Sequence, residues 1–124
     1  MKTIISILIL SFMSIGLSAQ NTELKAKYHK VSENDPYVYV TYYYDNGSIA
    51  ETGRLKDEAR DGVWISYDRF GNKRSKAVYA DNEKTGSWSI WSMNGELVAK
   101  MIYHKNVLES VTYNTSVEKI AYVD

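Results

Sequence analysis

The chain has 124 residues and a formal net charge of zero, from 15 basic and 15 acidic side chains. Because non-specific nucleic-acid binding needs a basic surplus, this balance argues against nucleic acid as a partner. The absence of Cys excludes both a disulfide framework and the acylated residue of a bacterial lipoprotein, while eleven Tyr and three Trp beside a single Pro are typical of a β-sheet.

Residues 1–19 are typical of a secretory signal peptide. Lys2 supplies a short basic start, two apolar runs follow it, and the small pair Ser18-Ala19 precedes the expected cleavage. We therefore expect a secreted or periplasmic protein whose mature part, residues 20–124, forms one small domain. The alternative is an uncleaved N-terminal anchor, although the apolar segment is short for a membrane span.

A polar N-terminal arm over residues 20–36 ends at a turn signal, Asn34-Asp35-Pro36. Within it, residues 24–31 are either a short edge strand or a loosely held arm. The next run, residues 37–44, consists almost entirely of β-branched and aromatic side chains, and it predicts the strongest strand of the chain.

Turn signals divide the rest of the chain into further strands. Asp45-Asn46-Gly47 contains the dipeptide that two-residue hairpin turns favour, because both central residues of such a turn need positive φ. A second class of polar turn is expected over 57–61 and 81–85. The strands are expected near 37–45, 48–56, 62–69, 72–80, 86–93, 96–104, 107–113 and 117–123.

Residues of the same type recur at an interval of 24. An even interval places equivalent residues on one face of a sheet, because side chains alternate between faces. Gly53 and Ala77 leave room there for a neighbouring ring. The pattern predicts an all-β fold, an open antiparallel meander of tandem β-hairpin repeats. The recurring sets are Gly47, Gly71 and Gly95; Tyr43, Tyr67 and Trp91; Gly62 and Gly86; Trp64 and Trp88.

Residues 62–71, which read Gly-Val-Trp-Ile-Ser-Tyr-Asp-Arg-Phe-Gly, resemble the variant MORN repeat of bacteria, whose wording is Gly-x-Trp-x-x-Tyr-x-x-x-Gly. Residues 86–95 form a second copy with Trp91 in place of Tyr, and 43–47 match the tail of an earlier copy. The resemblance covers about 41–106. It assigns 37–106 to MORN-like hairpin repeats and leaves 107–124 as a C-terminal strand pair or cap. Its repeat-core residues are Gly62, Trp64, Gly71, Gly86, Trp88 and Gly95.

The resemblance implies a β-hairpin array that acts as an interaction surface. Many bacterial members are described as antitoxin-like, and MORN repeats more broadly are associated with membrane phospholipids and protein scaffolding. A signal peptide would place the partner outside the cytoplasm.

The sequence carries no constellation expected of an enzyme, a metal centre or a cofactor site. His29 and His104 are the only histidines, and neither has a second ligand at metal-binding spacing. Exposed, rigid aromatic rings suit partner recognition. Trp64 and Trp88 are expected to fill the space between hairpins, and the partner-binding candidates are Tyr39, Tyr42, Tyr43, Tyr67 and Trp91.

The leading hypothesis is a non-catalytic exported module that binds another protein. The alternatives are a cell-wall carbohydrate-binding module, since choline-type wall-binding repeats are also short hairpins rich in Trp, Tyr and Gly, or a phospholipid-binding module. An open meander also leaves unpaired edges. Either residues 117–123 or the arm at 20–36 caps an edge, or the chain forms a dimer through it.

Overall fold

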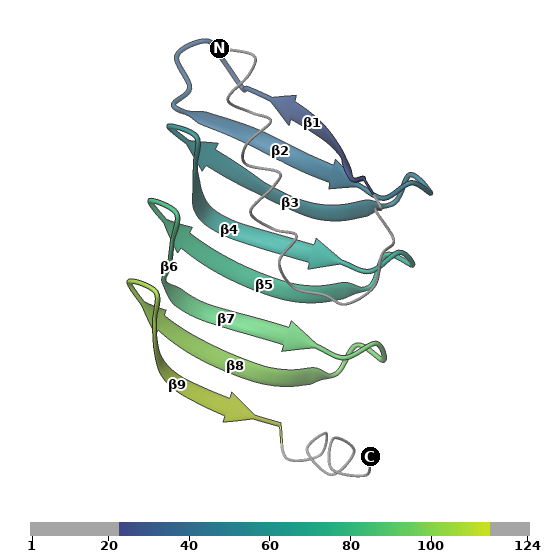
Figure 1. The fold of residues 1–124 in the computed structure, drawn as a ribbon, viewed down its shortest axis with the longest axis vertical. Helices are drawn as coiled ribbons and strands as arrows, with labels where there is room; N and C mark the ends of the chain where they lie inside the picture. The colour runs from purple at the N-terminus through teal and green to yellow at the C-terminus, as the bar shows by residue number, and fades with distance from the viewer. Residues whose placement is uncertain (1–22, 115–124) are drawn as a thin grey trace.

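The computed structural model describes residues 23–114, which form an all-β fold of nine antiparallel strands without a helix (Figure 1). Within this part of the chain, therefore, there is no helix long and apolar enough to cross a membrane. The expected signal peptide and the expected strand at 117–123 lie outside the described residues. The strands are β1 (Lys25–His29), β2 (Tyr37–Tyr43), β3 (Ile49–Lys56), β4 (Ala59–Tyr67), β5 (Lys73–Ala80), β6 (Glu83–Lys84), β7 (Gly86–Trp91), β8 (Leu97–His104) and β9 (Val107–Tyr113).

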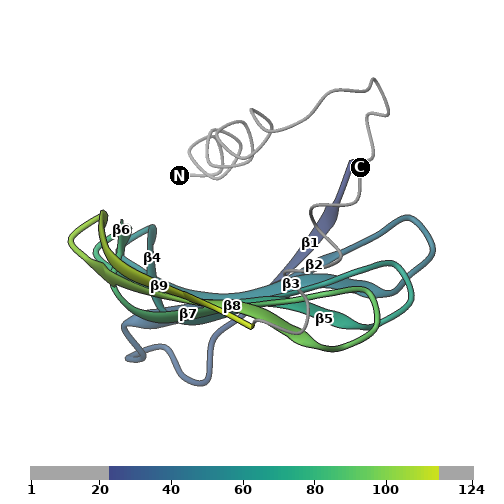
Figure 2. The same ribbon diagram turned by 90° about the horizontal axis from the view of Figure 1, so that it is seen from below.

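The strands form one open sheet in the order β1-β2-β3-β4-β5-β7-β8-β9, with the short β6 paired to β5. Apart from β6 and β7, which both pair with β5, each strand pairs with its neighbour in sequence, so the prediction of an open antiparallel sheet is confirmed. Residues 24–31, which the sequence predicts as either a short edge strand or a loosely held arm, contain the edge strand β1, which pairs with β2. Seen end-on, the sheet is a single curved layer (Figure 2).

The turns at Gly47, Gly71 and Gly95 differ from the sequence-based expectation. Gly47 has a φ of 86°, but Asn46 is not among the residues with positive φ. The Gly47 amide donates to the Tyr44 carbonyl at 3.0 Å, and the Tyr44 amide donates to the Ser48 carbonyl at 2.8 Å. This is a three-residue loop in which only the glycine is left-handed, and the prediction of a two-residue turn at Asn46-Gly47 is wrong.

The two-residue turns lie at the opposite ends of the strands, and their central residues do not include a glycine. Asp57 and Glu58 both have positive φ, 50° and 67°, between the paired ends Lys56 and Ala59. The same conformation recurs at Asp81-Asn82 and Lys105-Asn106. The expected five-residue turn over 57–61 is therefore too long.

The strand expected at 62–69 begins earlier, at Ala59. Gly62 does not start it but lies inside it with a φ of 69°, at an irregularity in the pairing of β3 with β4. A glycine tolerates this conformation because it has no Cβ, and β-bulges use it for that reason. Gly86 has a φ of 65°, but it does begin its strand, β7.

The core lies on one face of the sheet, which we call the tryptophan face. Val40, Trp64 and Ala77 are buried there and form its centre. A Cβ on Gly53 would lie 2.1 Å from Trp64 Cδ2, so the ring packs directly on the glycine backbone. Trp88 packs against this cluster, and the two tryptophans therefore share one face, as the even spacing predicted. The partly buried residues around the centre are Ala26, Tyr42, Leu55, Tyr79 and Trp88.

Candidate interaction surfaces

Cations and aromatic rings alternate along the tryptophan face. The Arg60 guanidinium lies 3.9 Å from the centre of the Trp64 ring and 5.3 Å from that of Tyr79. Lys84 Nζ lies 5.2 Å from the Trp88 ring and 5.3 Å from that of Tyr103. The Trp88 ring also contacts Tyr79 at 5.2 Å and Tyr103 at 5.0 Å between centroids. Residues 23–114 form a single-layer sheet with no second layer to cover its apolar side, and these stacked side chains cover it instead.

Arg60 is the charged centre of this arrangement. It is 7% exposed, and its Nη1 donates to Glu51 Oε1 at 2.7 Å while Nη2 donates to Oε2 at 3.4 Å. The Glu51 carboxylate therefore neutralises the buried guanidinium through two parallel hydrogen bonds. Because the cation is already paired and stacked, this part of the tryptophan face is built chiefly for packing.

The two tryptophans differ in their hydrogen bonding. Trp88 Nε1 donates to the carbonyls of Val78 and Thr85, each at 3.1 Å. Trp64 Nε1 is buried and has no acceptor among residues 23–114. Packing on Gly53 rather than a hydrogen bond therefore fixes the Trp64 ring.

Burial raises the pKa of Tyr42 and of Tyr79 above its ordinary value, because the tyrosinate form loses hydration in this face. The nearby Arg60 guanidinium opposes the increase at both rings. Tyr42 was predicted as a partner-binding ring, but the structure places it among the residues packed on the core.

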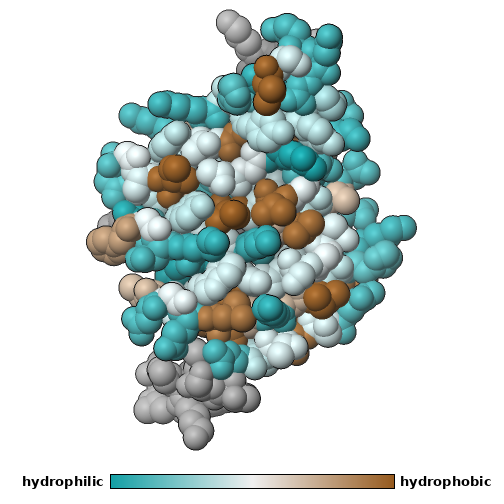
Figure 3. Space-filling view, turned by 180° about the vertical axis from the view of Figure 1, so that it is seen from behind, coloured by the Kyte–Doolittle hydropathy of each residue, from teal (hydrophilic) through white to brown (hydrophobic). Residues whose placement is uncertain are grey.

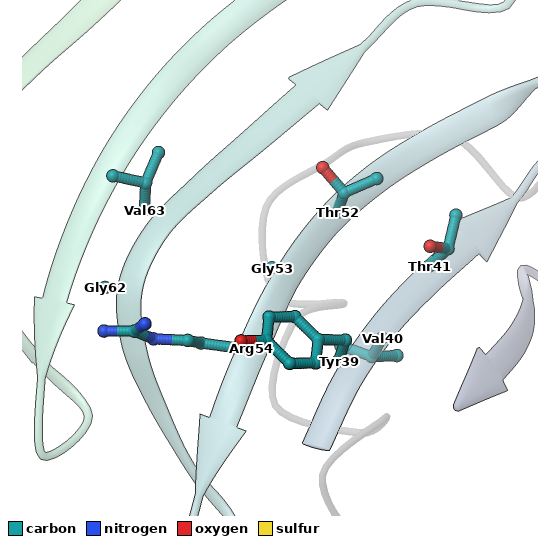
Figure 4. A pocket seen from close by; sticks show the side chains of 8 residues that line it. All are labelled: Tyr39, Val40, Thr41, Thr52, Gly53, Arg54, Gly62 and Val63. Atoms are coloured by element: carbon teal, nitrogen blue, oxygen red, sulfur yellow. The ribbon is translucent and has the colours of Figure 1, made fainter. Parts of the chain in front are cut away.

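The other face, which we call the threonine face, carries an open hollow of about 450 Å³ over β2, β3 and β4. Figure 4 shows the side chains of Tyr39, Thr41, Thr52, Arg54 and Val63 around it. Gly53 and Gly62 form its floor, since neither carries a side chain to fill it. The hollow is therefore a consequence of the glycine that admits Trp64 on the other face and of the bulge at Gly62.

Arg54 is held in a fixed position at this hollow. Its Nη2 lies 2.9 Å from Asp61 Oδ2, and its guanidinium lies 4.2 Å from the centre of the Tyr37 ring. A Cβ on Gly62 would come within 2.8 Å of Arg54 Nε, so the glycine also makes room for the arginine. The rim of the hollow thus combines a positioned cation with hydroxyl groups and an aromatic ring.

Hydrophobic side chains are exposed on the threonine face between hydrophilic ones (Figure 3). Tyr39 is 36% exposed, Val63 45% and Ile102 38%. Val63 and Tyr39 both line the hollow. Isolated exposed apolar residues are ordinary, but apolar residues around a hollow with a fixed cation are a candidate contact surface.

The structure does not gather the five predicted aromatic residues at one site. Tyr43 and Trp91 are half-buried at strand ends, each beside a lysine: Lys27 Nζ lies 5.2 Å from the Tyr43 ring and Lys73 Nζ 5.2 Å from the Trp91 ring. Tyr67 is also half-buried, and its carbonyl accepts a hydrogen bond from the Tyr44 hydroxyl at 2.6 Å. Of the five, only Tyr39 lines the hollow.

Sequence reasoning missed the roles of Arg54, Arg60 and Val63. Their type gives no signal by itself, because charged and β-branched residues are common on strands. Only the strand register places Arg60 opposite Leu55 on the tryptophan face and Arg54 opposite Asp61 on the other. Within residues 23–114, no group of three or more His, Cys, Asp or Glu side chains is arranged to hold a metal ion.

Comparison with known proteins gives no match to a protein-family model, to a curated protein or to a solved structure.

Proposed function

We propose that this chain is an exported, non-catalytic module built from MORN-like hairpins that binds another protein, with an antitoxin-like role as the most specific form of that function. The proposal of tandem repeats is supported by turns that recur at the interval found in the sequence. Gly47, Gly71 and Gly95 all have positive φ, and so do both residues of the three two-residue turns. Register shifts also follow Tyr42, Ser66 and Ile90. Export to the periplasm or beyond is supported by the sequence of residues 1–19.

The observation that carries the binding proposal is the hollow on the threonine face. Tyr39 and Val63 are exposed beside it, and Asp61 and the Tyr37 ring hold Arg54 in place. Partner interfaces concentrate their binding energy in aromatic and arginine side chains that are already ordered. This hollow offers one of each beside hydroxyl groups, so a complementary protein surface is the occupant that it fits best.

The test is affinity capture of the exported chain from the cell envelope, followed by measurement of the captured partner's affinity. We expect Tyr39→Ala to weaken that partner's binding by about tenfold or more, as truncation of an aromatic anchor does. Phe70→Ala is the matched control, because Phe70 is 85% exposed but lies in a turn away from the hollow. A partner bound equally well by Tyr39→Ala and by the unaltered chain would refute the proposed surface.

A further inference from the structure

Eight side chains form an unbroken row across the threonine face, one from each strand of the main sheet path. Each is directly opposite the next in the antiparallel register, and directly opposed residues project from the same face. Figure 4 shows two of them, Thr41 and Thr52, beside the hollow. In sheet order the row is Lys27, Thr41, Thr52, Ile65, Lys76, Ser89, Lys100 and Thr112.

The row is basic and rich in hydroxyl groups. It contains three lysines, four Ser or Thr residues and no carboxylate. The three ion pairs of residues 23–114 use Arg54, Arg60 and Arg69, so none of them neutralises a lysine of the row. The chain as a whole has no net charge, but this row carries positive charges that none of these ion pairs neutralises. Such a row attracts an anionic ligand.

The centre of the row is Lys76-Ser89-Lys100, on β5, β7 and β8. Both lysines are exposed, whereas Ser89 is buried between them at 9% exposure. Two strand spacings separate the lysines, which is about 10 Å. Their ammonium groups can therefore approach one anionic group from both sides, above the small side chain of Ser89.

We propose that this row binds a linear anionic glycan that runs across the strands. A row that crosses eight strands is about 34 Å long, which suits a polymer better than a single ion. The hydroxyl groups of Thr41, Thr52 and Thr112 can exchange hydrogen bonds with sugar hydroxyls, while the lysines pair with the carboxylates. The row has no aromatic ring on which an uncharged sugar would stack, so charge rather than stacking selects the ligand.

This inference does not depend on the proposed protein partner. The two surfaces meet at Thr41 and Thr52, which belong to the row and also line the hollow. Lys76 and Lys100 lie outside the hollow, and Tyr39 lies outside the row. Variants at these positions therefore separate the two kinds of binding.

The experiment uses the exported chain and fluorescently labelled polygalacturonate, with its methyl ester as the uncharged probe of the same backbone. We expect the charged polymer to bind, with an affinity that falls as salt is added, and the ester not to bind. Lys76→Gln combined with Lys100→Gln should weaken binding by about tenfold, as expected for the loss of two exposed ion pairs. The control is Lys30→Gln combined with Lys56→Gln, which removes the same charge from exposed positions outside the row and should change binding less than about twofold.

Three results would overturn the proposal: no binding of polygalacturonate, equal binding of the ester, or equal loss in both double variants. A fourth would replace it, namely binding of phosphatidylglycerol vesicles through Lys76 and Lys100 without binding of the glycan. Near-ultraviolet circular dichroism of each variant checks that the sheet is intact. Tyr39→Ala should leave glycan binding unchanged, so failure of the protein-partner proposal is distinguishable from failure of this one.

Discussion

Gly53 affects both faces of the sheet: the packing of the core on the tryptophan face and the shape of the hollow on the threonine face. On one side it admits the Trp64 ring, and on the other it forms the floor of the hollow. A methyl group at this position would lie 2.1 Å from Trp64 Cδ2, far inside van der Waals contact. The ring has no second position to occupy, because Val40 and Ala77 pack around it. The stability of the core and the shape of the surface are therefore linked through one missing side chain.

We expect Gly53→Ala to destabilise the chain by about 1–3 kcal/mol, the usual range for overpacking a core. Urea denaturation gives the free energy of unfolding. Thr52→Ala, one residue away on the other face, is the control and should cost less. If the clash is the cause, Gly53→Ala will cost less in a Trp64→Phe background, because the smaller ring leaves room for the methyl group. Equal costs in both backgrounds would show that the strain lies elsewhere.

Tyr42 and Tyr79 give stability a predicted pH dependence. Burial raises the pKa of both rings, so the unfolded chain ionises them at a lower pH than the folded chain does. The stabilisation is fully present below their ordinary pKa of about 10 and is lost as pH rises from there through the raised folded value. We expect the free energy of unfolding to fall as the pH rises above about 10.

Tyr79→Phe isolates this effect, since it keeps the ring and removes the titrating hydroxyl. The fall in stability at alkaline pH should be smaller in Tyr79→Phe than in the unaltered chain. Tyr113→Phe is the control, because that ring is 60% exposed. A pH profile that Tyr79→Phe leaves unchanged would rule out burial of this ring as the cause.

At the level of single elements, the two-residue turns are where the sequence conflicts with the backbone. Glu58 has a φ of 67°, a left-handed conformation that costs a residue with a Cβ about 1 kcal/mol. We expect Glu58→Gly to raise the free energy of unfolding by about that amount. Asn82 has the same φ of 67°, but asparagine tolerates this region better, so Asn82→Gly should gain less. A gain at Asn82 that equals or exceeds the gain at Glu58 would contradict this explanation.

The same turns show what can be predicted from sequence in this fold. The run of β-branched and aromatic residues at 37–44 correctly predicts β2, and the even spacing of Trp64 and Trp88 correctly predicts their shared face. Glycine predicts a two-residue turn at Asn46-Gly47, and this prediction is wrong. The two-residue turns form instead at positions such as Asp57-Glu58, where strand pairing imposes positive φ without a glycine. Local propensity is a weak guide where long strands on both sides fix the turn between them.

The surfaces were harder to predict than the strands because they depend on register. The threonine face needs every strand to pair in the correct register, since a slip of one residue moves each side chain to the other face. The bulge at Gly62 shifts the register between β3 and β4. Simple alternation of side chains along the sequence does not predict this shift.

At the scale of the whole molecule, the two edges of the described sheet differ in how well they are protected. The β1 edge carries Lys25 and Lys27, and lysine is a common device against strand pairing. The β9 edge has only Glu109 as a charged residue, and Leu108 and Tyr113 are 46% and 60% exposed. An antiparallel pair of two β9 strands centred on Ser110 would place no like charges opposite each other, whereas two β1 strands centred on Lys27 would oppose lysines.

We therefore expect the chain to dimerise through β9. Size-exclusion chromatography with light scattering should show a dimer fraction that increases with concentration. Ser110→Lys should abolish it, because the substitution places two ammonium groups opposite each other at the centre of the pair. Ser110→Thr is the matched control, since it keeps the hydroxyl and favours a strand. If the unaltered chain stays monomeric at high concentration, the β9 edge is covered, and the strand predicted at 117–123 is then the segment to delete in search of the cap.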